Sequence, residues 1–467
     1  MTSEKRSRSE RGDVGLMPFP ARVRTDRLAN GLRVVTVQCP HLHGAAAALY
    51  ARAGSRYENA DSNGLSHFVE HMLFRGCESH PSSFSLNSAI EERCGMLNGE
   101  TGRDYSLYQV SCHPRDLGDV LGILGDLFTA PLFTDIDLER NIVLEEILDD
   151  FDERGQRVNI DDVGRGHAWG RHPLGFPITG PERNIRGFTR AHVVRHFRRH
   201  YGARNMVLAV AGPLDHARVL ACARRSLAGL PAGRRLTPRP APMRLAGPRF
   251  LAVRTDSAQV EVQILLHALS DRHPLYPAQV LLLRLLDDGM ATPLHYRVCD
   301  RKGLAYHVSA GLEPLADTAL VEISAACAAG KLLSLLAEVF AILREMREQP
   351  APQVAIDRVK RRYARDLEAG FDDVESLCAW FGDSLLFDRP LRTPVERYCR
   401  VARVEVEQIT RVARKIFRPE RLVVTTVGSF TPSVSRKARA LVLGFGGATS
   451  SVSSRPSRAR PTRSPRR

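Results

Sequence analysis

Apolar residues alternate with polar ones in several short stretches of the chain, and in other stretches they return at every third or fourth position. The first spacing predicts β-strands and the second predicts amphipathic helices. The predicted order in the first half is strand, strand, helix, strand, helix, and the second half repeats it. We therefore expect an α+β fold in which two tandem homologous α/β-sandwich halves form a clamshell, each with helices on one face of a mostly antiparallel sheet. The strands are expected at 32–37, 44–54, 106–113, 250–255, 260–268, 305–312 and 318–328, and the helices at 63–76, 116–128, 276–289 and 331–346.

A basic segment with four prolines, residues 234–248, lacks apolar periodicity and predicts a linker between the two halves. Further helix-rich pieces are expected at 135–155 and 352–387. The chain then divides into a disordered arm at 1–20, a first domain at 21–233, the linker, a homologous second domain at 249–432 and a basic disordered tail at 433–467.

The composition is that of a globular protein, with 43% hydrophobic and 25% charged residues among 467. No apolar stretch reaches the roughly 18 residues of a membrane helix, and the N-terminal residues lack the apolar core of a secretory signal. The nine cysteines are scattered singly, which argues against a disulfide framework and favours a reducing compartment. We expect a cytoplasmic location, with export to the periplasm or elsewhere as the open alternative.

The net charge of +15 raises the question of a nucleic-acid partner. Residues 436–467 hold nine basic and no acidic residues, so the net charge of the remaining chain is a modest +6. The charge is therefore concentrated in the tail, and no nucleic-acid partner is expected. The tail is interpreted as a solvated segment, with a weak electrostatic tether to an acidic surface as the alternative.

The sequence H-F-V-E-H at 67–71 lies within the helix expected at 63–76. His67, Glu70 and His71 then share one face, because they are three and four residues apart. Two imidazoles one turn apart can both bind one Zn²⁺, and a carboxylate between them can take a proton from a water on the metal. Taken alone, the motif also fits a solvated helix face.

A catalytic zinc site needs a third protein ligand and an open position, so the motif predicts a distant carboxylate on a second helix. The segment 139–150 is such a helix by its pattern. By itself an acidic helix of this kind is usually a solvated surface, but beside an H-x-x-E-H helix the third ligand is favoured. Its acidic residues are Glu139, Glu145, Glu146, Asp149 and Asp150.

Together these motifs resemble the pitrilysin/insulinase family of zinc metallopeptidases, which carry the inverted H-x-x-E-H motif. The chain is most similar to the small two-domain branch of mitochondrial processing peptidase subunits and their bacterial relatives, over about 28–428. The resemblance is carried by LANGLRVVTV (28–37), AGSRYEN (53–59), NGLSHFVEHMLFRG (63–76), LNGETGRDYSLY (97–108), ERNIVLEEI (139–147), NMVLAVAG (205–212) and RKGLAYHVSAG (301–311).

The resemblance implies that His67, His71 and Glu146 bind the zinc and that Glu70 is the general base, which makes the first domain the catalytic one. Glu139, two turns before the implied third ligand, matches the accessory carboxylate of the family. Its expected role is to orient a ligating imidazole.

Two further residues are implied to contact substrate. Asn98 matches a residue beside the sheet edge at which family members hold the substrate as an added strand. Tyr306 matches a tyrosine that reaches the substrate carbonyl, where a phenol could stabilise the developing oxyanion. The family arginine seven residues before this tyrosine is Cys299 here, and either Arg297 or Arg301 is a possible substitute.

The duplication allows an internal comparison. Matching Gly76 with Gly289 places Val280, Leu283 and Arg284 opposite the three motif residues, so the second half has no zinc-competent residues in that helix. One zinc per chain is therefore expected.

The function implied is a zinc metalloendopeptidase that cleaves unfolded or extended peptides inside a closed chamber. Such a chamber usually takes four domains, which implies a homodimer or a heterodimer with an inactive homologue. The alternative is a non-catalytic assembly or binding subunit of a processing-peptidase-like complex.

Overall fold

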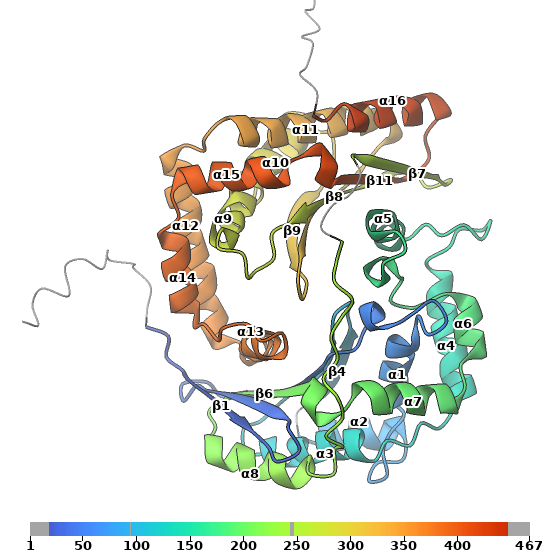
Figure 1. Ribbon diagram of the computed structural model, residues 1–467, viewed down its shortest axis with the longest axis vertical. Coiled ribbons are helices and arrows are strands. Elements are labelled where there is room, and N and C mark those ends of the chain that lie inside the picture. The colour runs from blue at the N-terminus through green and yellow to red at the C-terminus, as the bar shows by residue number, and fades with distance from the viewer. Residues whose placement is uncertain (1–17, 94, 243–246, 447–467) are drawn as a thin grey trace, which may run out of the picture.

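The computed structural model describes residues 18–93, 95–242 and 247–446, which form two α/β halves around two sheets (Figure 1). The first sheet has six strands in the order β1-β2-β6-β3-β5-β4. All neighbours are antiparallel except β2 and β6, which are parallel. The strands are β1 (Arg22–Arg27), β2 (Arg33–Gln38), β3 (Ala45–Ala51), β4 (Met96–Thr101), β5 (Ser106–Cys112) and β6 (Met206–Gly212).

The second sheet has five strands in the order β7-β11-β8-β10-β9. Here too one pair, β7 with β11, is parallel and the others are antiparallel. The prediction of two similar α/β halves with mostly antiparallel sheets is confirmed. The strands are β7 (Arg249–Arg254), β8 (Val260–Ala268), β9 (Val308–Pro314), β10 (Ala319–Cys327) and β11 (Leu422–Gly428).

Most helices cover the outer face of the sheet of their own half and enclose its main apolar core. The first half has α1 (Leu65–Leu73), α2 (Ser83–Glu91), α3 (Leu117–Thr129), α4 (Ile136–Leu148), α6 (Glu182–Gly187), α7 (Arg190–His200) and α8 (His216–Ser226). The second half has α9 (Tyr276–Leu286), α10 (Pro293–His295), α11 (Leu332–Glu348), α12 (Gln353–Ala369), α14 (Pro394–Ala402), α15 (Val406–Ile416) and α16 (Pro432–Leu443).

The inner faces of the two sheets are covered by an exchange of helices between the halves. Helix α5 (Ile160–Trp169) of the first half packs against β8 and β11, and α13 (Val374–Leu386) of the second half packs against β3 and β6. Figure 1 shows both helices between the sheets. The sequence interpretation placed helices on one face only. The strands need both faces covered because they are apolar on both, as in β2, where the successive residues Val34 and Val35 are each fully buried.

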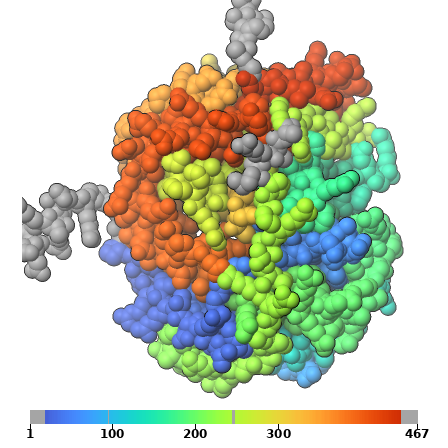
Figure 2. All heavy atoms as spheres, viewed as in Figure 1, coloured from blue at the N-terminus to red at the C-terminus, as the bar shows by residue number. Residues whose placement is uncertain are grey.

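The segment between the halves lies against both of them. Arg52 and Arg56 of the first half donate hydrogen bonds to the carbonyls of Leu236 and Arg239. The backbone N–H of Ala241 donates to Asp317 of the second half. Figure 2 shows residues 234–242, in yellow-green, crossing the surface where the halves meet. The linker therefore has no regular secondary structure over these residues but is held at several points.

The disordered segments predicted at 1–20 and 433–467 include residues that are folded in the structure. Phe19, placed in the disordered arm, packs edge-on against Phe371 with ring centroids 5.0 Å apart. The expected tail begins inside α16, whose Ala438 and Val442 are buried, and Phe445 after it is fully buried. These predictions were wrong because a few apolar residues at helical spacing suffice to dock a basic helix onto a core. The rest of the arm and of the tail lies outside the described residues.

Several elements of the first half had not been expected from the sequence, among them the strands β1, β4 and β6 and the helices α2, α7 and α8. The strand expected at 305–312 begins only at Val308, so Tyr306 precedes it. Among the described residues, no helix is both long and apolar enough to cross a bilayer.

The helix exchange makes a prediction about Gly382, which lies where α13 crosses the first sheet. A Cβ atom there would lie 2.4 Å from Cε2 of the buried Tyr50 ring, so Gly382→Ala must push α13 away from the sheet. We expect the free energy of unfolding to fall by about 1–3 kcal/mol, measured by urea denaturation. The control is Gly122→Ala in α3, where a Cβ meets nothing within 4 Å and a gain of up to about 1 kcal/mol is expected. Equal effects of the two substitutions would contradict the close approach of α13.

Candidate metal centre

Helix α1 presents two different faces along its nine residues. Phe68 and Met72 are fully buried and belong to the core of the first half. His67, Glu70 and His71 lie on the other face, three and four residues apart. The apolar contacts therefore fix the rotation of the helix and with it the direction of the three polar side chains.

The start of α1 is held by a buried carboxylate that the sequence interpretation missed. The N-cap residue is Gly64, with φ of 99°. Glu58 accepts hydrogen bonds from the backbone N–H groups of Gly64 at 2.9 Å and Ser66 at 2.6 Å, and from Nδ2 of Asn63 at 3.0 Å. These are donors that a helix start otherwise leaves without partners. The only sequence signal was an acidic residue a few positions before the helix.

Helix α4 brings Glu146 opposite both histidines of α1. Its Oε1 lies 3.5 Å from Nε2 of His67, and its Oε2 lies 3.5 Å from Nε2 of His71. The three residues offer ligand atoms that all lie within 4.8 Å of one another, and no other such group of histidine, cysteine or acidic residues exists in the described part of the chain. The structure thus brings together the three residues that the resemblance implied as metal ligands.

The spacing of these atoms fits a zinc ion. Two ligand atoms that each lie about 2.1 Å from a tetrahedral ion are about 3.4 Å apart, close to the two observed separations. The donor set of two imidazoles and a carboxylate is one that zinc accepts in catalytic sites. The side chain of Glu146 is 45% exposed, so one side of the group is open to solvent and to a substrate. His67, His71 and Glu146 could therefore hold a zinc ion with one position free.

Glu139 supports the group from behind. Its Oε2 lies 3.1 Å from Nδ1 of His71, and its Oε1 lies 3.2 Å from an amino group of Arg75. The side chain is only 6% exposed. The contact at Nδ1 orients the ring of His71 so that Nε2 faces Glu146, as an orienting carboxylate should.

The two imidazoles differ in their electrostatics. Burial lowers the pKa of His67 to about 4, which keeps that ring neutral and free to bind a cation. Burial also acts to lower the pKa of His71, but the hydrogen bonds to Glu139 and Glu146 outweigh it and raise the pKa to about 9. The hydrogen bond from His71 in turn lowers the pKa of Glu146. The acidic pair therefore favours a positive charge at this point of the structure, and a metal cation would supply it.

Glu70 lies on α1 between His67 and His71 but is not part of the group that could hold the metal. Its Oε2 is buried without a hydrogen-bond partner among the described residues, and burial raises the pKa of its carboxyl. Strand β4 passes very close, since a Cβ atom on Gly99 would lie 2.9 Å from Oε1 of Glu70. A carboxylate with a raised pKa and a free oxygen is suited to accept and return a proton.

Strand β4 is one of the two edge strands of the first sheet and passes close to Glu70. Its side chains alternate, so that Met96, Asn98 and Glu100 are exposed while Leu97 is buried. Asn98 is therefore exposed on an edge strand whose second side pairs with no other strand among the described residues. Such an edge can accept a further strand.

The residues expected from the second half are not brought to the metal centre. The ring of Tyr306 is 97% exposed and so packs against no side chain of the centre. Cys299 is half-buried against the core of the second half. Arg297 forms ion pairs with two acidic residues of α11 and is therefore engaged within its own half. Arg301 is exposed.

The counterpart of the motif in α9 has a different chemistry. Val280 and Leu283 pack against the core of the second half. Arg284 forms ion pairs with Asp288 and Asp366. Within the described chain, α9 therefore offers no metal ligands at these positions.

Comparisons with known proteins match both halves to one family. Residues 33–182 match the model of "Insulinase (Peptidase family M16)", and residues 187–363 match that of "Peptidase M16 inactive domain". All residues of the metal centre lie within the first match.

The chain is also similar over most of its length to curated proteins. It is 28% identical to an uncharacterized zinc protease of Streptomyces coelicolor, over 86% of this chain and 89% of that protein. It is 28% identical to one of Mycobacterium tuberculosis, over 84% and 90%. It is 25% identical to a probable mitochondrial-processing peptidase subunit beta of Schizosaccharomyces pombe, over 87% and 91%.

Solved structures share the fold. A protease from Helicobacter pylori superposes with a TM-score of 0.79 at 18% identity, over 87% of this chain and 99% of that one. A peptidase M16 inactive domain from Pseudomonas fluorescens superposes with a TM-score of 0.81 at 19% identity, over 88% and 99%.

The buried cap of α1 generates a first prediction for the site. Glu58→Gln replaces one accepting oxygen by an amide NH₂ that faces a backbone donor, so a buried N–H loses its partner. We expect the free energy of unfolding to fall by about 1–3 kcal/mol in urea denaturation. Asp61→Asn, an equivalent change at an exposed position of the same loop, should stay within about 0.5 kcal/mol. A Glu58→Gln protein as stable as the control would show that the cap contributes nothing.

The contact between Glu139 and His71 generates a second prediction. Glu139→Gln keeps the shape of the side chain but removes the charge that orients the imidazole and favours a cation. Zinc affinity, measured by competition with a chromogenic chelator, should fall by about 10–100-fold. Glu145→Gln, on the exposed side of the same helix, should leave the affinity unchanged. The supporting role is wrong if both variants bind zinc as the wild type does.

Proposed function

The chain belongs to the insulinase (peptidase M16) family, and on that premise we propose that it is a zinc-dependent endopeptidase that cleaves unfolded or extended peptides. The observation that supports this most strongly is the spacing of the ligand atoms of His67, His71 and Glu146, next to the free carboxylate oxygen of Glu70. Relatives named as zinc proteases support the same reaction class.

Zinc, when bound, supplies Lewis-acid polarisation of the scissile carbonyl and makes an attacking water more acidic. Oε2 of Glu70 accepts the proton of that water and later returns it to the nitrogen of the leaving amine. The raised pKa of Glu70 suits both steps, because a more basic carboxylate takes the proton more readily and still releases it to an amine. His67 stays neutral, and Glu139 holds the ring of His71 in place.

The substrate is proposed to bind along β4 as an additional strand. The free edge offers backbone donors and acceptors, which bind any extended chain with little regard to its sequence. Gly99 brings this edge next to Glu70, and Asn98 projects on the solvent side, where it can contact a substrate side chain or backbone. Only segments that can extend are suited to this mode, so folded proteins are poor substrates.

Two parts of the proposal concern groups beyond the metal centre. The side chain of Tyr306 is 97% exposed, and we propose that its phenol contacts the substrate carbonyl once a peptide is bound. We further propose that the active form is a homodimer or a heterodimer with an inactive homologue, which encloses a four-domain chamber. A relative named as the beta subunit of a mitochondrial-processing peptidase supports a paired assembly.

A non-catalytic subunit is the second candidate function, and the match to an inactive domain is the observation that favours it. That match covers residues 187–363, whereas the metal centre lies within 33–182. Because the described residues keep three ligands and the candidate base together, the catalytic function is the better supported of the two.

The general base provides the direct test. Glu70→Gln should keep one zinc per chain, because Glu70 is not a ligand, and should reduce turnover of a quenched unstructured peptide by about 10²–10⁴-fold. Glu145→Gln, which changes an exposed carboxylate on α4, is the matched control and should retain most of the activity.

Full activity of Glu70→Gln would refute the assigned base. A wild-type chain that binds zinc stoichiometrically yet cleaves no peptide, alone or mixed with a homologue, would instead favour the non-catalytic subunit. Zinc content and turnover are therefore measured on the same samples.

A further inference from the structure

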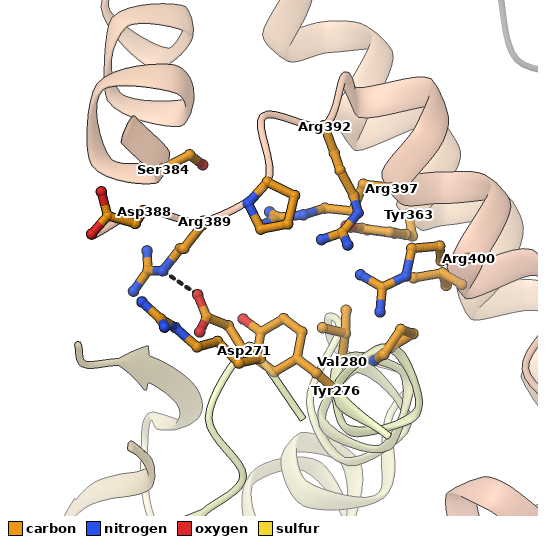
Figure 3. Close-up of a pocket in the computed structure, with 14 residues that line it drawn as sticks. Asp271, Tyr276, Val280, Tyr363, Ser384, Asp388, Arg389, Arg392, Arg397 and Arg400 are labelled. Carbon is orange, nitrogen blue, oxygen red and sulfur yellow. Dashed lines mark ion pairs between the residues drawn. The ribbon is translucent and has the colours of Figure 1, made fainter. Parts of the chain in front are cut away.

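A cavity of about 270 Å³ lies in the second half, and none of its lining residues belongs to the metal centre (Figure 3). Its wall is formed by the loop after β8, one face of α9, Tyr363 of α12, the end of α13, the loop that follows it and α14. It is many times larger than the roughly 30 Å³ of a water molecule and lies near the lower limit of small-molecule sites. The volume therefore suits a small ligand rather than a length of peptide.

The wall of this cavity is strongly basic. Five arginines contribute to it, against two acidic residues, Asp271 and Asp388. Both acidic residues are already engaged. Asp271 is ion-paired with Arg389, and Asp388 is ion-paired with arginines from the first half and from the linker. The arginines of the wall are Arg272, Arg389, Arg392, Arg397 and Arg400.

Three of these guanidinium groups gather at one end of the cavity without a carboxylate. No ion pair within the described chain involves Arg392, Arg397 or Arg400. Figure 3 shows them extending toward the hollow, Arg392 from the loop and the other two from α14. All three are half-buried, so water screens their mutual repulsion only in part. Burial, followed by the charges of Arg392 and Arg397, lowers the pKa of Arg400.

The surroundings hold this cluster in position. The guanidinium of Arg397 stacks 4.1 Å above the centroid of the Trp380 ring. The indole N–H of Trp380 donates to the carbonyl of Arg392 at 2.8 Å, which fixes the loop that carries this arginine. Like charges held together at a cost to the fold are typical of a site that is completed by a ligand of opposite charge.

We propose that this cavity binds a small phosphate-bearing anion, with inorganic phosphate as the simplest case. Planar guanidinium groups match the oxygens of a tetrahedral oxyanion and can each donate two parallel hydrogen bonds. The phenol of Tyr276, which also lines the cavity, provides a further donor. Asp271 is ion-paired with Arg389, which also pairs with Asp383, whereas the three remaining arginines of the cluster have no carboxylate partner among the described residues.

The position of the cavity relates it to the duplication. Val280 in its wall is the residue opposite His67, and α9 and α12 contact each other as α1 and α4 do. In the second half, a cluster of arginines thus lies next to the position that corresponds to the metal ligands of the first half. One copy of the unit is built to hold a cation, and the other is proposed to hold an anion.

The test is phosphate binding by the full chain with zinc present, measured by calorimetry and by thermal unfolding at constant ionic strength. The wild type should bind inorganic phosphate and unfold at a higher temperature with it. Arg400→Gln should bind phosphate at least about tenfold more weakly, because it loses a charge-assisted hydrogen bond. Without phosphate it should unfold at the same temperature as the wild type or higher, since one repelling charge is gone.

Arg403→Gln is the matched control, because Arg403 is exposed just beyond the end of α14 and is not part of the wall. It should bind phosphate as the wild type does. Any phosphate that binds at the metal centre contributes equally to both variants, so the difference between them reports on the cavity. Arg392→Gln tests the same cluster should Arg400→Gln not fold.

Equal phosphate affinity in the wild type, Arg400→Gln and Arg403→Gln would overturn the proposal, and so would the absence of binding. Acetate is titrated as a second anion of different geometry. Acetate binding as tight as phosphate binding would also overturn the assignment, because it would show a general attraction for anions rather than a phosphate site.

Discussion

The packing of α1 against α4 is the constraint on which the metal centre depends. Neither helix holds a complete ligand set, so the separation of Nε2 atoms on one helix from a carboxylate on the other decides whether an ion can be bound. That separation is set by contacts that contain no ligand. The buried side of α1 fixes its rotation, Glu58 holds its start, and the pair of Glu139 with His71 ties the two helices together.

The two halves show how one architecture can carry opposite electrostatics. In the first half the carboxylates of α4 face the imidazoles of α1 and favour a cation. In the second half the corresponding helix α9 has apolar residues and an arginine that is paired with acidic residues, while the neighbouring cavity collects arginines. The fold tolerates this difference in charge because the polar groups lie on the side of each helix that does not face its core. After the duplication, the sites could diverge while the sheets and the outer helices stayed the same.

The sequence was sufficient to predict the local features of this structure, such as the relative positions of residues within one helix. His67, Glu70 and His71 are fixed relative to one another by helical spacing alone, so the order of residues is enough to identify them as neighbours. Glu146 required the family resemblance, since five acidic residues in its segment satisfied the same chemical requirement. The cap at Glu58 depends on a loop conformation that no periodicity reports. The family resemblance implied a contact of Tyr306 with substrate, and in the structure the ring of Tyr306 is 97% exposed.

The exchange of α5 and α13 could not be predicted from the sequence. Apolar periodicity indicates whether a helix forms, but not which sheet the helix packs against. The exchange also connects the two halves of the chain. Each half covers the inner face of the other's sheet, so separating the halves would expose apolar surface on both sheets at once. Ion pairs between Arg165 of α5 and two glutamates of the second sheet add to this connection. The two halves are therefore held together by apolar contacts on both sheets as well as by ion pairs.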